Sequence, residues 1–132
     1  MPAEHHIDHE NNLIITTWEG AATDTEFLEV LSEYQKNILC APDCNTYNEV
    51  FDVSQATEIN ITIEGLLKIG REASKTDHLF THKKLAFIVS SDWAFSLVRT
   101  YEFYRTIGKK SSKKVSVFKN KDEAIAWAKS NT

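Results

Sequence analysis

The amino-acid sequence predicts a single α/β domain, built on a mixed, mostly parallel sheet of about five strands with about four helices. After an opening hairpin, β-branched and aromatic segments alternate with segments of helical periodicity, which gives the order β-β-α-β-α-β-α-β-α. Residues 85–89 (LAFIV) are a nearly continuous apolar run, as expected for a parallel strand covered on both faces. The 132 residues are the length of one domain, which we place over residues 1–132.

The outer elements are predicted from short local patterns. One strand surrounds Ile7, a second covers residues 13–18 (LIITTW), and the Asn-Asn pair at 11–12 suits the tight turn between them. At the other end of the chain, residues 114–118 read as the last strand. Asn120 then caps a short final helix.

The first two helices are predicted from their caps and their apolar spacing. Thr23 and Glu26 form a capping box, which begins a helix that ends near Leu39. A third strand at 49–53 precedes the second helix, residues 62–75. The apolar positions expected to face inward in that second helix are Ile63, Leu66, Leu67 and Ala73.

The third helix, residues 93–107, carries more aromatic residues than one core stripe needs. On a helical wheel Phe95 and Phe103 lie away from the stripe, on the side that also holds Arg99. Either another part of the chain covers these rings, or they form a partner surface that fits homodimerisation or the entry of an apolar ligand. The stripe expected to face the core is Trp93, Leu97, Val98, Tyr101 and Tyr104.

Polar side chains follow the third and fourth strands. Asp52, Ser54, Ser90, Ser91 and Asp92 should lie at the carboxyl ends of adjacent parallel strands, where open α/β sheets bind ligands. These residues are our candidates for holding a small polar ligand or contacting a partner. The alternative, which we favour, is that they cap the third helix and shape a turn.

Three segments resemble the STAS fold, and within it the SpoIIAA-like group related to anti-sigma-factor antagonists and Sec14-type domains. They are VFDVSQAT (50–57), KLAFIVSSDWAFSLVRTYEFY (84–104) and VSVFKNKDEAIAWA (115–128). The resemblance implies a non-enzymatic regulatory module. It departs from the antagonists at Thr62, the hydroxyl that stands where their phosphorylated switch serine belongs. We interpret Thr62 as a helix N-cap rather than a phosphorylation site.

Catalytic and metal sites are not indicated. No nucleophile–base pair, glycine-rich phosphate loop or Gly-x-Ser-x-Gly elbow is present in the sequence, so we expect no enzyme and no cofactor. His5, His6 and His9 divide between the two faces of a strand, which does not close a tetrahedral metal site. Cys40 and Cys44 lack a second cysteine pair, and we expect a structural or incidental role for them.

Composition and charge indicate an ordinary globular protein. No secretory signal or 20-residue apolar span is visible, so we expect a cytoplasmic protein without a transmembrane segment. Residues 1–60 carry a net charge of −11 and residues 61–132 carry +7, for −4 overall. The lysine-rich loop at 108–114 (GKKSSKK) is interpreted as a solvated turn, because nucleic-acid binding is not expected of an acidic chain without interleaved aromatic residues.

Two function hypotheses remain open. The first is a cytoplasmic binding or regulatory module that acts through protein–protein contact. The second is a carrier or sensor of a lipid or another apolar small molecule, suggested by Gly65 and Gly70 in the second helix and by the aromatic residues of the third. An apolar cavity above ~300 Å³ under the second helix would favour the carrier.

Overall fold

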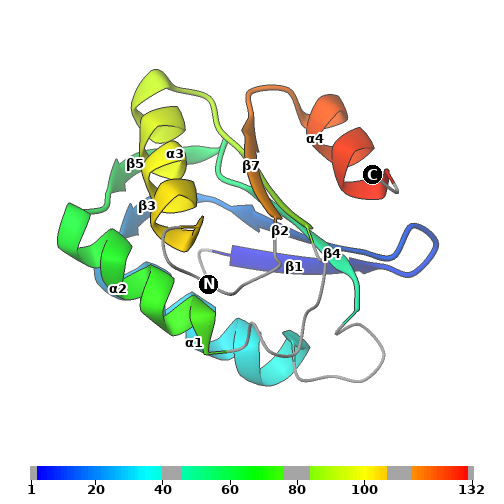
Figure 1. Cartoon of the computed structure of the whole chain (residues 1–132), viewed down its shortest axis with the longest axis horizontal. Coiled ribbons are helices and arrows are strands. Elements are labelled where there is room, and N and C mark those ends of the chain that lie inside the picture. Colours follow the sequence, from blue (N-terminus) through cyan, green and yellow to red (C-terminus); the bar gives the residue numbers. More distant parts are fainter. Residues whose placement is uncertain (1–2, 40–45, 76–83, 107–113, 131–132) are drawn as a thin grey trace.

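The computed structural model describes residues 3–39, 46–75, 84–106 and 114–130, whose arrangement Figure 1 shows. A five-stranded sheet has the spatial order β1-β2-β4-β6-β7; β1 runs antiparallel to β2 and the other neighbours are parallel. This confirms the predicted mixed, mostly parallel sheet. Its elements are β1 (Ala3–Asp8), β2 (Leu13–Trp18), β4 (Asn48–Asp52), β6 (Lys84–Ile88) and β7 (Lys114–Phe118), with helices α1 (Asp24–Tyr34), α2 (Ile63–Ser74), α3 (Asp92–Thr106) and α4 (Lys121–Lys129).

Helices cover the sheet on both faces (Figure 1). On one face Trp18 and Phe87 belong to a hydrophobic core shared with α1, α2 and α3. On the other face Leu13, Val50 and Ile88 pack with the small residues of α4. Every residue of β6 is buried, as predicted for a strand that is covered on both sides.

Two short strands are absent from the predicted order. Strand β3 (Gly20–Thr23) and strand β5 (Ala56–Asn60) pair in parallel as a separate two-stranded sheet. The segment between Ser54 and the second helix, for which no element was predicted, therefore contains a strand. The polar side chains of β5 face solvent while Ile59 packs on the core. A short edge strand with so few apolar residues is difficult to distinguish from a turn when its partner strand is not known.

The predicted helix starts are confirmed by their caps. Thr23, Thr62 and Asn120 each accept a hydrogen bond from the amide three residues later, at 3.2, 2.9 and 3.0 Å. The first helix continues beyond α1 as a short π-helix, η1 (Gln35–Leu39), and so ends where the sequence predicted.

The inward face of α2 is predicted only in part. Leu66 is buried as expected, but Ile63 and Leu67 are 51% and 36% exposed, so their assignment to the core is wrong. The buried row is Gly65, Leu66 and Ile69, because α2 packs with this row between α1 and α3. Each residue step turns the chain by about 100°, which leaves Ile63 and Leu67 on the outer face.

The core stripe of α3 is predicted correctly except at its start. Leu97, Val98 and Tyr101 are buried as predicted. Trp93 is 58% exposed, which contradicts its expected place in the core, and the next residue, Ala94, is buried in its place. The side chain of Tyr104 lies outside the part of the chain that the structure describes. In the ranges described, no helix combines the length and the apolar character needed to cross a membrane.

Candidate functional site

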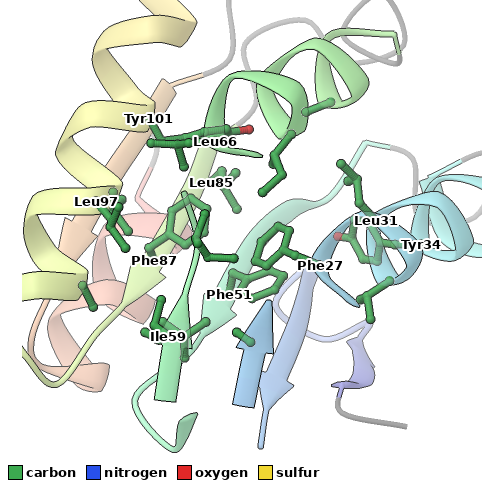
Figure 2. A pocket seen from close by; sticks show the side chains of 18 of the residues that line it. Phe27, Leu31, Tyr34, Phe51, Ile59, Leu66, Leu85, Phe87, Leu97 and Tyr101 are labelled. Carbon is green, nitrogen blue, oxygen red and sulfur yellow. The ribbon is translucent and has the colours of Figure 1, made fainter. Parts of the chain in front are cut away.

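A cavity of about 110 Å³ lies between the sheet and the three helices α1, α2 and α3 (Figure 2). Strands β3, β4, β5 and β6 and the adjoining residues Val53 and Ile61 contribute the rest of the lining. Among the described lining residues only Tyr34, Glu49 and Tyr101 have polar side-chain atoms, and the others are hydrocarbon. A concave, mostly apolar space with a few polar groups is the usual form of a small-molecule site.

Aromatic rings form a continuous row beside this cavity. The ring centroids lie 5.5 Å apart between Trp18 and Phe27, 5.3 Å between Phe27 and Phe51, and 5.6 Å between Phe51 and Phe87. Tyr101 of α3 meets Phe87 edge to face at 5.9 Å. Figure 2 shows the rings of Phe27, Phe51 and Phe87 turned toward one another from α1, β4 and β6. These contacts hold large flat side chains in fixed positions along one wall.

Helix α2 forms the roof of the cavity. Its main contacts are with α1 and α3 rather than with the five-stranded sheet, and it points Leu66, Ile69 and Ala73 into the space. Hydrogen bonds from Thr62 to Asp24 attach its first turn to the start of α1. The roof is therefore held by its neighbouring helices, and the cavity lies beneath it.

A polar pair lines the cavity at the end of α1. The hydroxyl of Tyr34 donates to Oε2 of Glu49 at 2.9 Å, and both side chains are buried. The His5 ring lies against Tyr34 with centroids 4.9 Å apart, and its Nδ1 is 2.7 Å from the hydroxyl of Thr16. Burial lowers the pKa of His5, while the nearby Glu33 carboxylate acts in the opposite direction.

The candidate residues after β4 lie together at the end of that strand. Asp52 is buried, and its Oδ1 accepts hydrogen bonds from the amide and hydroxyl of Ser54 at 2.9 and 2.5 Å. This is the local turn geometry that aspartate and serine commonly form. Thr62, further along, is the N-cap of α2 and is exposed. A ligand role for these three residues stays a prediction.

The candidate residues after β6 surround the start of α3. Ser90 is exposed, and the hydroxyl of Ser91 accepts from the amide of the third residue after it at 3.1 Å, as a cap does. Asp92 forms an ion pair with Lys119, and this contact lowers the pKa of the Asp92 carboxyl. The Lys119 ammonium also lies 5.6 Å from the centre of the Phe95 ring, so Asp92 and Phe95 share one cation.

The outer side of α3 is partly exposed. Phe103 is 60% exposed, whereas Phe95 is half-buried and packs against the core. Arg99 forms an ion pair with Glu102 one turn later, at 3.5 Å. The two phenylalanines thus have different environments, and only Phe103 has the exposure that a partner surface requires.

Sequence reasoning missed the lining of the cavity. Phe27 and Tyr34 fall within the first predicted helix and Phe51 within the third predicted strand, and no space between these elements was predicted. The one available signal was Glu49, a charged residue in a strand that is otherwise apolar on that face. Its proximity to Tyr34 depends on how α1 packs on β4, and spacing along the chain does not contain that information.

The histidine and cysteine predictions concern other parts of the chain. His9 is bonded to the Tyr47 hydroxyl at 2.8 Å, and His6 is exposed on β1. Within the described ranges, no group of three or more metal-ligating side chains comes together. Cys40, Cys44 and most of the lysine-rich loop lie outside the described residues. The absence of a metal site stays a prediction.

Comparison with known proteins gives the fold. Neither known protein families nor curated proteins give a match to this sequence. The chain is similar to a solved structure, that of an uncharacterised protein of the DUF3478 family from Shewanella loihica PV-4. That protein is described as having a SpoIIAA-like fold. The TM-score is 0.58 with 11% sequence identity, over 96% of this chain and 93% of that one. The chain therefore has a SpoIIAA-like α/β fold, as its sequence motifs predicted.

Proposed function

We propose that this protein is a non-enzymatic binding module, which holds a small apolar molecule in the cavity beneath α2. The observation that carries the proposal is the cavity itself, with its hydrocarbon lining and its row of aromatic rings. Protein interiors normally close such spaces, since a void forfeits contacts on every side. A space of this size, kept open under a helix that is attached to its neighbours, is consistent with a ligand site.

The volume limits the size of the ligand. Drug-sized ligands occupy pockets of roughly 300–1,000 Å³, and the cavity of about 110 Å³ is smaller. It therefore does not reach the volume expected above for a carrier of a lipid or of another large apolar molecule. An apolar cavity of about 150 Å³ in another protein admits benzene or xenon. We therefore propose a ligand no larger than a single ring, from the small-molecule part of the carrier hypothesis, rather than a lipid.

Binding of benzene or toluene to the full chain tests this proposal. Either ligand should raise the melting temperature, because a ligand that binds only the folded state stabilises it. Filling the space by Ala94→Leu, at a lining position on α3, should abolish the shift. Ala126→Leu, at an exposed position on α4, is the matched control and should retain the shift. No shift in the wild-type protein would contradict the proposal.

A protein-contact role is the second candidate function. Four large apolar side chains are exposed on α2 and α3, and exposed apolar residues are common at interaction sites. They are Ile63, Leu67, Trp93 and Phe103. The homodimer considered in the sequence analysis would use the surface of α3 around Phe103. Light scattering that shows a monomer at high micromolar concentration would contradict the homodimer.

The remaining parts of the proposal rest on the sequence alone. We propose that the protein has no enzymatic activity, since no catalytic motif is visible in the sequence, and that it works in the cytoplasm. Regulatory action through a partner would then accompany ligand binding.

A further inference from the structure

A ligand in the cavity would be covered by the cavity walls on most sides. All the lining residues that the structure describes are buried or half-buried. Part of the wall therefore has to move when a ligand enters or leaves, as lids do in other binding sites. The helices are the parts of this wall that can move without breaking the pairing of the strands.

Helix α2 is held mainly by the other two helices. Helix α1 packs on β3 and α3 packs on β7, whereas the main contacts of α2 are with α1 and α3. Its inner residues Leu66, Ile69 and Ala73 lie over the cavity. Glycine inside a helix lowers its stability, and α2 contains both Gly65 and Gly70. Few buried contacts and a weak helix favour local opening, so α2 is the wall most suited to move.

The start of α2 is fastened to α1 by one side chain. The carboxylate of Asp24 accepts from the amide and the hydroxyl of Thr62, at 2.9 and 2.7 Å. The same hydroxyl accepts from the amide of Gly65 and so caps α2. Thr62 is exposed, so water can take over these hydrogen bonds when the helix lifts.

A second contact holds the other end of α2. The side-chain amide of Gln35, in η1, donates to the carbonyl of Glu72 at 2.8 Å. A hydrogen bond between uncharged groups is weaker than a pair of hydrogen bonds to a carboxylate. The contact between Asp24 and Thr62 is therefore the stronger of these two attachments.

We infer that α2 is the gate through which a small apolar molecule enters and leaves the cavity, and that the contact between Asp24 and Thr62 is its latch. The inference rests on the proposed function, because it concerns the same cavity. The latch is closed in the folded protein with and without ligand, so it contributes equally to both states. Its loss therefore changes the rates of ligand exchange and leaves the affinity unchanged.

The exchange of benzene with the full chain tests this inference. Relaxation-dispersion NMR of the methyl groups of Leu85 and Leu97, which line the cavity, measures the association and dissociation rates. Asp24→Ala opens the latch, and both rates should rise by about tenfold. The dissociation constant, which is the ratio of the two rates, should change by less than about twofold.

Three further variants separate the latch from general loosening. Asp122→Ala removes a first-turn carboxylate from α4, and Lys119→Met removes the ion pair with Asp92 at the start of α3. Neither should change the exchange rates. Asp24→Asn keeps an acceptor for the Thr62 amide and should raise both rates by less than Asp24→Ala does. It provides the comparison if Asp24→Ala does not fold.

Hydrogen exchange in the wild-type protein tests the gate without any variant. If benzene leaves when α2 opens, benzene at ten times its dissociation constant should slow amide exchange in α2 by about tenfold. Amides of α4 that exchange by local opening should be unaffected, because α4 lies on the other face of the sheet and the ligand stays bound.

A parallel rise of both rates in Asp24→Ala, absent from Asp122→Ala and Lys119→Met, supports the inference. Unchanged rates in the Asp24 variants overturn it, as does an equal rise in either control variant. Exchange in α2 that benzene does not slow also overturns it. These three outcomes leave the proposed function in place. If benzene does not bind the wild-type protein, the proposed function fails, and the inference fails with it.

Discussion

The amide and the hydroxyl of Thr62 both donate to the carboxylate of Asp24, at 2.9 and 2.7 Å, although the two residues are 38 positions apart. Asp24 is in the first turn of α1 and Thr62 is the N-cap of α2. One carboxylate therefore joins the starts of two helices, and a carboxylate near helix N-termini is also favoured by their dipoles. This contact fixes the edge of the roof above the cavity.

Asp24→Ala should therefore loosen α2. It removes two charge-assisted hydrogen bonds, and a loss of about 1–3 kcal/mol in the free energy of unfolding is expected. Amide hydrogen exchange in α2 should accelerate more than in α4. Asp122→Ala, which removes a first-turn carboxylate from α4, is the matched control. Equal acceleration of α2 in both variants would show that Asp24 has no special role.

Gly65→Ala should destabilise the protein, although glycine to alanine inside a helix ordinarily stabilises by about 1 kcal/mol. A Cβ at Gly65 would clash with the carboxyl of Asp24, which cannot move away without losing Thr62. In the Asp24→Ala background this obstacle is absent, and Gly65→Ala should then be stabilising. Urea unfolding of the two single variants and the double variant measures this change of sign. The same sign in both backgrounds would contradict the explanation.

These contacts show where sequence reasoning stops. The five strands of the main sheet and the caps at Thr23 and Thr62 depend on local patterns, and these were predicted correctly, whereas the short strands β3 and β5 were missed. The rotation of α2, with Gly65 against Asp24, depends on how α2 packs between α1 and α3. That packing is not visible in local patterns, and Ile63 and Leu67 were therefore assigned to the wrong face.

The cavity was beyond prediction for a similar reason. Its size is set by the lengths of side chains from seven helices and strands, and its polar end by Tyr34 and Glu49, which meet only after α1 packs on β4. A sequence pattern predicts which side chains turn inward. It does not predict whether they fill the space.

Stability should fall as the pH drops below the ordinary pKa of histidine, about 6.5, and His5 should contribute to the loss. Burial lowers the pKa of His5 in the folded protein, so the unfolded chain binds its proton more readily. The contribution of neutral His5 to the free energy of unfolding is fully present above the ordinary histidine pKa. It declines as the pH falls from there toward the lowered pKa of His5 in the folded protein.

Urea unfolding between about pH 5 and pH 8 measures this contribution. His5→Gln should decrease the slope of the unfolding free energy against pH, because it removes a group that binds protons preferentially in the unfolded state. His6→Gln, on the same strand, controls for the replacement of a histidine in β1. An unchanged slope in His5→Gln would contradict the prediction.

Lys84→Met should weaken the attachment of α4 to the sheet. Lys84 is buried in β6, and its ammonium donates to the Trp127 carbonyl at 2.9 Å and to the Ser130 carbonyl and hydroxyl at 2.9 and 2.6 Å. The charge also lies 5.1 Å from the centre of the Trp127 ring. Burial lowers the pKa of Lys84, and the charge of Lys114 lowers it further.

The ammonium thus binds carbonyls at the C-terminal end of α4, where the Trp127 carbonyl also accepts from the amide and the hydroxyl of Ser130. Methionine keeps the length of the side chain but offers no donor, so we expect a loss of about 1–3 kcal/mol in unfolding free energy, with faster hydrogen exchange in the last turn of α4. Lys114→Met removes the same charge from an exposed position opposite Lys84 in the sheet register, and should change stability by less than about 0.5 kcal/mol. A similar loss in both variants would mean that net charge, rather than the contact with α4, explains the effect.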